Sequence, residues 1–276
     1  MLNDRKYIAE LIAIQLNANK NVLKEQFLQN KETIGYFYLD NLLPNELVHQ
    51  IHESFPKLEE TVKKKNIREY KYLAYQMDAY NHLLEEVIYA FQEEKVVNLV
   101  SEICDIENLM PDSNLYAGGL SLMANKNYLN PHLDNSHDKD RNLWRVLNLL
   151  YYVTPNWKVE NGGNLELWQE GLKKEKTTVV SKFNRLVVMA THQNSWHSVS
   201  KVHVDDIRCC VSNYYFSNKP LLATDNFHVT SFRAEKGQKI KDLLLQFDTK
   251  VRGGIRAFFK KGIRENPHEY KKTRSK

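Results

Sequence analysis

Hydrophobic residues recur at helical spacing over three stretches of the chain. From Asp4 to Leu28 the apolar positions lie three or four residues apart with few breakers, which predicts a helix. A second helix is predicted after Pro44, because proline fits the first turn of a helix, and it should end at Pro56. The same period returns from Tyr80 to Ile103. The N-terminal third is therefore expected to be rich in helices.

The pattern changes between Leu115 and Tyr215, where short β-branched and aromatic runs alternate with turn residues. These runs are LYAGGLSLMA, RVLNLLYYVT, NLELWQ, TTVVSKF, RLVVMA and RCCVSNYYF. Many short strands at this spacing are typical of a barrel or jelly roll. A last helix is predicted from Glu235 to about Ile263, with Gly253-Gly254 as its weak point.

Composition agrees with a globular protein. The chain has 276 residues, of which 42% are hydrophobic and 11% aromatic, enough for a packed core. Charges interrupt the first thirty residues, and no apolar run approaches the roughly 18 to 20 residues of a membrane-spanning helix. The three cysteines, Cys104, Cys209 and Cys210, form no CxxC motif. We therefore expect a cytoplasmic protein with reduced thiols.

The positive charge is concentrated in the tail. The net charge of the chain is +5, and residues 250–276 contain ten Lys and Arg residues and only two acidic residues. Basic residues recur there every four positions beside an apolar row: Arg252, Arg256, Lys260 and Arg264, next to Val251, Ile255, Phe258 and Phe259.

Two interpretations of this tail remain open from the sequence. Such a helix can lie in the headgroup layer of an anionic membrane, as a peripheral contact through residues 250–276. Alternatively, the apolar row packs on the domain and the basic row is solvated. Nucleic acid is not expected as a partner, because the basic residues are not interleaved with aromatic ones.

The strongest chemical signal is a pair of separated motifs. Pro131-His132-Leu133-Asp134 lies among the early strands, and His197 follows sixty-three residues after Asp134. Two imidazoles and one carboxylate can occupy one face of a ferrous ion and leave positions for a 2-oxo acid and dioxygen. His132 and Asp134 can point to one side of a strand, so the third ligand must come from a distant strand that folds back alongside.

Two nearby features refine this hypothesis. A second HxD motif, His203-Val204-Asp205, is expected to be a solvated turn, since no suitable third histidine follows it. Arg208 lies eleven residues after His197 at the start of a strand, where its guanidinium could grip a carboxylate as a bidentate fork. A local ion pair of Arg208 with Asp205 or Asp206 is the alternative.

With these residues in place, the chain resembles the prolyl-4-hydroxylase-like branch of the Fe(II)/2-oxoglutarate dioxygenases. The matching blocks run in order from 35 to 217: YFYLDNLLPNELVHQIHESFP, PHLD, RVLNLLYYVTPNW, NGGNLELW, RLVVMATHQNSWHSV and RCCVSNYYFS. The resemblance implies an α+β fold with a double-stranded β-helix (jelly-roll, cupin-like) core, N-terminal helices packed on one sheet and a C-terminal helix. The implied domain spans 1–225, with a helical N-terminal region over 1–110 and a barrel core over 111–220, followed by a basic helical tail, 226–276.

The resemblance also implies site residues and cofactors. His132, Asp134 and His197 would hold Fe(II), and Arg208 would bind the distal carboxylate of 2-oxoglutarate; Tyr128 and Asn148 are further candidates for that pocket. Dioxygen is the other co-substrate, and ascorbate would keep the iron reduced. The implied reaction couples decarboxylation of 2-oxoglutarate to succinate with hydroxylation of an unactivated C–H bond. Asp134 argues against halogenation, because halogenases of this superfamily have a small residue in place of the carboxylate ligand.

The sequence leaves the substrate open. The run DNSHD after the metal motif and the basic tail resemble the 3-deoxy-D-manno-octulosonic acid (Kdo) hydroxylases, which modify the inner sugar of lipopolysaccharide at the cytoplasmic membrane face. A prolyl peptide or a small metabolite is the alternative substrate, and a barrel that only binds ligands is the alternative of another class. The oligomeric state is not determined by any of these features.

Overall fold

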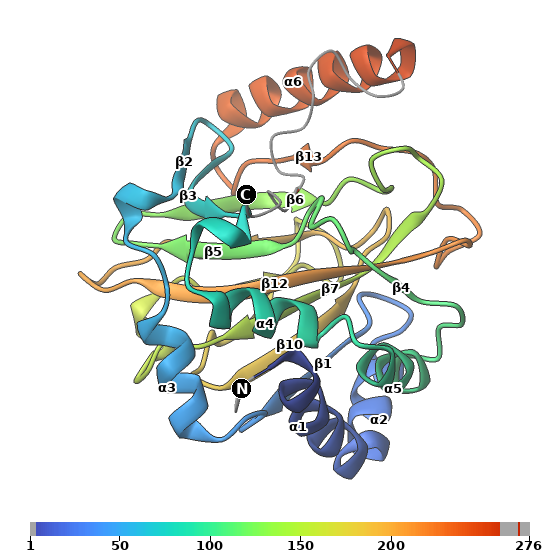
Figure 1. Ribbon diagram of the computed structural model, residues 1–276. Coiled ribbons are helices and arrows are strands. Elements are labelled where there is room, and N and C mark those ends of the chain that lie inside the picture. The colour runs from blue at the N-terminus through green and yellow to red at the C-terminus, as the bar shows by residue number, and fades with distance from the viewer. Residues whose placement is uncertain (1–3, 260–269, 271–276) are drawn as a thin grey trace.

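The computed structural model describes residues 4–259 and residue 270 (Figure 1). A strongly curved antiparallel sheet forms the centre of the molecule, with helices of the N-terminal third on one side and the last helix at the opposite end. The helices are α1 (Arg5–Ala18), α2 (Lys20–Gln29), α3 (Asn45–Glu53), α4 (His82–Ala90), α5 (Glu94–Cys104) and α6 (Lys239–Phe258).

The sheet has thirteen strands, all paired in antiparallel fashion, in the order β1-β10-β7-β12-β5-β3-β6-β11-β8-β9. β2 pairs with β3, β4 with β12 and β13 with β6. Their bounds are β1 (Tyr36–Asp40), β2 (Val62–Lys65), β3 (Glu69–Ala74), β4 (Met110–Pro111), β5 (Gly119–Met123), β6 (Tyr128–Leu133), β7 (Trp144–Tyr152), β8 (Leu165–Leu167), β9 (Thr177–Val179), β10 (Arg185–Ala190), β11 (His197–Val199), β12 (Arg208–Ser217) and β13 (Ser231–Phe232). The expected α+β fold with a curled, jelly-roll-like sheet is confirmed.

The N-terminal helices are shorter than the sequence predicted. The helix expected from Asp4 to Leu28 is two helices, because the chain turns at Asn19, whose side-chain amide donates to the carbonyl of Gln15 (2.9 Å). The single helix expected from Asp4 to Leu28 was wrong, because hydrophobic spacing alone does not reveal a one-residue break between two helices. The helical spacing from Tyr80 to Ile103 corresponds to α4 and α5.

The hairpin of β2 and β3 was also missed. Its first strand has the sequence VKKK, with three polar residues in a row and no apolar alternation that would reveal a strand. It lies within the N-terminal region that was expected to be helical. The hairpin extends the sheet beside β5 and β6 and forms one wall of the cavity described below.

Helices and sheet share one hydrophobic core. Large aromatic side chains from β7, β12 and β1, among them Tyr151, Tyr215 and Phe37, are fully buried there. Phe91 at the end of α4 packs on Tyr151, with ring centroids 5.7 Å apart. The helical layer thus covers the outer face of the larger section of the sheet and leaves its concave face available for a cavity.

The last helix is attached through its polar side. Asp242 accepts from Arg233 (2.7 Å), Asp248 pairs with Arg68 of the hairpin loop (3.2 Å), and Leu245 is the buried residue of α6. The helix continues through Gly253-Gly254, and positions 260–263 of the predicted helix lie outside the described residues.

The apolar row of α6 faces away from the domain. Its members are exposed from 37% to 92%: Ile240, Leu243, Leu244, Phe247, Val251, Ile255 and Phe258. Val251, Ile255 and Phe258 of the predicted row belong to this set, and Phe259 is also exposed, so the alternative in which the predicted row packs on the domain is wrong for the described residues. No described helix combines the length and apolar character needed to cross a membrane. The division of the chain at residue 225 stays a prediction, although β13 and α6 contact the sheet and its hairpin.

Candidate metal centre

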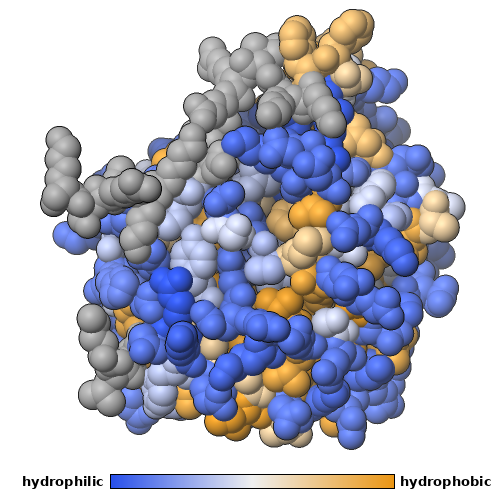
Figure 2. Space-filling view, turned by 45° about the vertical axis from the view of Figure 1, so that its right-hand side comes forward, coloured by the Kyte–Doolittle hydropathy of each residue, from blue (hydrophilic) through white to orange (hydrophobic). Residues whose placement is uncertain are grey.

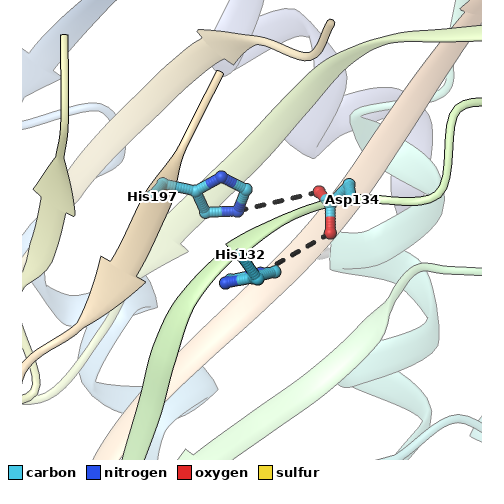
Figure 3. A group of neighbouring side chains, drawn as sticks. All are labelled: His132, Asp134 and His197. Atoms are coloured by element: carbon cyan, nitrogen blue, oxygen red, sulfur yellow. Dashed lines mark ion pairs between the residues drawn. The ribbon is translucent and has the colours of Figure 1, made fainter. Parts of the chain in front are cut away.

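Two histidines meet across neighbouring strands. His132 in β6 and His197 in β11 are direct partners in the antiparallel register, and their ring centroids are 4.1 Å apart. Asp134 follows the end of β6 by one residue and turns its carboxylate toward both rings (Figure 3). One ligand atom from each of the three residues lies within 4.8 Å of the others, and no other such group occurs among the described residues.

Hydrogen bonds fix the orientation of both rings. Nδ1 of His132 lies 3.0 Å from the carbonyl oxygen of Asn130, and Nδ1 of His197 lies 2.9 Å from that of Ser195. Because a carbonyl only accepts, each Nδ1 carries the proton and donates it. Each Nε2 then presents its lone pair toward Asp134, at 3.7 Å for His132 and 3.8 Å for His197. A backbone partner of this kind is what metal-binding histidines ordinarily have.

The charge states also suit a metal. Burial, and next the neighbouring His197, lower the pKa of His132 to about 3, so its imidazole is neutral at physiological pH. Burial would raise the pKa of the Asp134 carboxyl, but His197 and Arg145 outweigh it and hold the pKa below its ordinary value. Oδ2 of Asp134 is buried without a hydrogen-bond partner. A divalent cation would satisfy this oxygen, so the two imidazoles and one carboxylate fit ferrous iron.

The three residues line a cavity of about 390 Å³ inside the curled sheet. Arg208, at the start of β12, faces this cavity and is 3% exposed. Its Nη2 donates to Ser121 Oγ (3.2 Å), while its Nε is buried without a partner. Neither Asp205 nor Asp206, both exposed, pairs with it, so the expected alternative of a local ion pair is wrong.

The other two candidates for the co-substrate pocket differ in position. Asn148 in β7 lines the cavity, where its Nδ2 donates to the hydroxyl of Tyr214 (3.2 Å) and its Oδ1 has no partner. Tyr128 is not brought into the cavity. Its hydroxyl donates to the carbonyl of Asn66 (3.4 Å), and Lys241 lies over its ring.

A β-bulge accounts for the position of Tyr128. The register between β6 and β11 shifts between the pair His132–His197 and the pair Leu129–Val199. Within this interval β6 has one residue more than β11. The extra residue reverses which side chains of β6 point to each face of the sheet. Leu129 therefore shares the cavity face with His132, and Tyr128 points away. Period-two alternation in the sequence could not reveal this shift.

Arg145 is a cavity residue that the sequence did not single out. It lies in β7, 7% exposed, with Nη1 3.9 Å from Asp134 and its guanidinium over the ring of Tyr214. The register of β7 against β12 is irregular beside Arg145, so its face does not follow from counting back from Asn148. Its charge within an apolar strand was the available signal.

The second HxD motif and the run after Asp134 have structural roles. His203 and Asp205 are exposed in a segment without regular structure, as expected. His137 packs between Trp144 and Phe227, with ring centroids 4.0 Å and 5.7 Å away. Asp138 accepts from two backbone amides of the same turn. The run NSHD after Asp134 is thus a packed turn.

The comparison with protein families agrees with this geometry. Residues 118–216 match the model described as "2OG-Fe(II) oxygenase superfamily", and this segment contains the whole ligand set and Arg208. The protein is a 2OG-Fe(II) oxygenase. The oxygenase uses Fe(II) and 2-oxoglutarate, and its three buried ligands are the facial triad of that superfamily. No curated protein sequence matches the chain.

Several solved structures share the fold of this oxygenase. A prolyl 4-hydroxylase from Phytophthora capsici is 16% identical with a TM-score of 0.56, covering 90% of this chain and 77% of its own. A prolyl 4-hydroxylase from Pseudomonas putida is 16% identical with a TM-score of 0.53, and the alignment covers 70% of this chain and 97% of that protein. A prolyl hydroxylase from Trichoplax adhaerens, solved with a hypoxia-inducible-factor peptide, is 19% identical with a TM-score of 0.50, covering 77% and 96%. At these sequence identities the similarity establishes the fold and does not identify the substrate of this protein.

Proposed function

We propose that this oxygenase hydroxylates an unactivated C–H bond, with Arg208 binding the distal carboxylate of 2-oxoglutarate. The supporting observation is the buried guanidinium of Arg208, which faces the metal triad across the cavity and has no carboxylate partner among the described residues. A buried cation without a counter-charge is costly, and a carboxylate from the co-substrate would offset this cost. Asn148 and Tyr214, joined by a hydrogen bond, would form a polar wall of the same pocket.

The residues of the site would have separate roles in the reaction. His132, Asp134 and His197 would hold iron, which when bound supplies the redox chemistry that couples oxygen to decarboxylation of 2-oxoglutarate. The backbone carbonyls of Asn130 and Ser195 would keep both imidazoles oriented, and burial keeps that of His132 neutral. Asp134 occupies the position that a halide would need, so hydroxylation is favoured over halogenation. Ascorbate would keep the iron in its ferrous state.

For the substrate we propose a Kdo sugar of lipopolysaccharide or of a lipid A precursor, met at the inner face of an anionic membrane. The outward side of α6 supports a membrane partner, because it carries the exposed apolar row, which contributes to the hydrophobic surface in Figure 2. Lys239 and Lys250 of the same helix are also exposed. Both acids of this helix, Asp242 and Asp248, are instead paired with arginines on the domain side. An apolar face with cations and no acid is suited to anionic headgroups. A prolyl peptide or a small metabolite is the alternative substrate.

Succinate formation tests the activity and the substrate together. Anaerobic protein loaded with Fe(II) is mixed with 2-oxoglutarate and admitted to air, with and without a Kdo-bearing lipid or a prolyl peptide. The expected result is faster succinate release with the lipid and the addition of one oxygen atom to it. Turnover with peptides or free amino acids but never with a Kdo-bearing lipid would exclude the proposed substrate. Failure to bind both iron and 2-oxoglutarate would favour a barrel that only binds other ligands.

Liposome sedimentation tests the membrane partner. We expect the protein to bind phosphatidylglycerol liposomes more than phosphatidylcholine ones and to lose this binding as salt rises, because exposed charges are screened over about 8 Å at physiological ionic strength. Phe247→Ser should weaken binding, whereas Ile14→Ser, at an exposed apolar position on α1, should not. If Phe247→Ser instead dissociates an oligomer and leaves liposome binding unchanged, α6 contacts a second copy of the chain.

A further inference from the structure

Two lysines face each other on the cavity side of the hairpin. Lys64 in β2 and Lys71 in β3 are direct partners in the antiparallel register, and both line the cavity of the metal triad. Like charges placed directly opposite on one face of a sheet destabilise it. Burial, with Lys71 and Arg68 nearby, lowers the pKa of the Lys64 ammonium, although Glu69 opposes this shift. Glu69 offsets part of this repulsion, since burial would raise the pKa of its carboxyl but Lys71 and Lys64 hold that pKa below its ordinary value, and a bound anion would offset more of the repulsion.

The neighbouring residues strengthen the positive character of this wall. Glu69 pairs with Lys71 at 2.9 Å, and Asp248 of α6 is shared between Arg68 and Arg252. Arg68 and Arg252 line the cavity as well. The lining contains six Lys and Arg side chains and two acids, Glu69 and Asp134, so basic groups outnumber acidic ones even when Asp248 is added.

The opposite face of the hairpin provides a contrast. Lys63 and Lys65 point away from the cavity and lie over the rings of Tyr70 and Tyr72, with Lys65 Nζ 4.9 Å from the centroid of Tyr70. Cations over aromatic faces at an exposed surface have a structural explanation of their own. The cations on the cavity side also have partners, among them Glu69 for Lys71 and Asp248 for Arg252, but they line solvent-accessible space beside the metal triad.

We propose that Lys64, Lys71 and Arg252 form a subsite for an anionic group of the substrate, a phosphate or a carboxylate. This inference rests on the proposed function, because it assigns Arg208 to 2-oxoglutarate and leaves the hairpin cations for the substrate. Arg68 and Asp248 are positioning residues that hold Arg252 and the hairpin together. The reacting carbon of the substrate would then lie between this subsite and the metal triad.

Binding of small anions tests the subsite without turnover. Protein loaded with Zn(II) and 2-oxoglutarate is titrated with inorganic phosphate and, separately, with acetate, and the backbone amide shifts of the hairpin are followed by NMR. We expect saturable binding that Lys64→Gln and Lys71→Gln each weaken at least about tenfold, since hydrogen bonds to charged groups contribute roughly 1.5–3 kcal/mol. Lys63→Gln, the matched control on the same strand, should leave the affinity unchanged. The stronger of the two probes identifies the group.

The outcomes separate this inference from the proposed function. If 2-oxoglutarate binds normally but neither anion shifts the hairpin amides, or if Lys63→Gln weakens binding as much as Lys64→Gln, the subsite is wrong and the hydroxylase proposal stands. If 2-oxoglutarate fails to bind, the proposed function fails, and the anion titration of the metal-loaded protein still decides the subsite. Thermal unfolding of each variant shows whether it folds, and Lys71→Arg, which keeps the charge, should preserve binding.

Discussion

His132 and His197 are sixty-five residues apart in the sequence and directly opposite each other in the sheet, with ring centroids separated by 4.1 Å. This pairing of β6 with β11 places both Nε2 atoms within 4 Å of the Asp134 carboxylate. The metal centre therefore depends on one strand register, and a slip by a single residue would turn one histidine to the other face.

Asp134→Ala should abolish both metal binding and succinate formation, because it removes the only carboxylate of the triad. Added Ni(II) or Zn(II) should raise the melting temperature of the wild type, by linkage of binding to folding, and leave that of the variant unchanged. His203→Ala, in the second HxD motif, is the matched control and should behave as the wild type. Equal thermal shifts for wild type and Asp134→Ala would place the metal elsewhere.

Substitutions at Arg208 should act on 2-oxoglutarate affinity. Loss of a bidentate charged contact in Arg208→Met should weaken binding by about 2–4 kcal/mol, or roughly 30- to 1,000-fold. Arg208→Lys retains the charge without the fork, so its affinity should lie between those of Arg208→Met and the wild type. Isothermal titration calorimetry of the Zn(II)-loaded protein measures this. Arg185→Met, at a surface pair with Asp40, should have no effect, and equal affinities for Arg208→Met and wild type would contradict the assignment.

Asn148 and Tyr128 should differ in their effect on 2-oxoglutarate. Asn148→Leu replaces a polar side chain of the cavity and leaves the hydroxyl of Tyr214 without this partner, so we expect weaker binding by about 1–3 kcal/mol. Tyr128→Phe changes a residue that the bulge turns away from the cavity and should leave the affinity unchanged. The same calorimetric titration compares them, and the reverse order of effects would show that the bulge is misplaced.

Asn184→Ala should destabilise the fold by about 2–4 kcal/mol, because Asn184 is fully buried and holds three groups together. Its Oδ1 accepts from the amide of Leu43 (3.0 Å) and from the hydroxyl of Tyr151 (2.8 Å), and its Nδ2 donates to the carbonyl of Leu43. Asn156→Ala is the control, since Asn156 also has a positive φ but is exposed. Denaturant unfolding compares the two, and equal losses would attribute the effect to backbone strain alone.

Much of this protein could be predicted from its sequence. The helical spacing before residue 104 and the strand-turn alternation after residue 115 identify the fold class, because both periods are local properties of the chain. The metal site of His132, Asp134 and His197 could be predicted from the chemistry of these side chains, because a site of this kind requires their two strands to lie side by side. Boundaries were less well predicted: the chain turns at Asn19 between α1 and α2, within a stretch of continuous helical spacing.

Only the tertiary structure decided which side chains share the cavity. The bulge in β6 turns Tyr128 away from the cavity, and the irregular register of β7 turns Arg145 toward it. Strand β2, with three lysines in a row, places Lys64 opposite Lys71. The tertiary structure also turned the apolar row of α6 outward, because Arg233 and Arg68 pair with its acids on the domain side. The sequence by itself determined the residue types and local periods of this protein. Strand register and helix orientation result from long-range contacts, which no local pattern encodes.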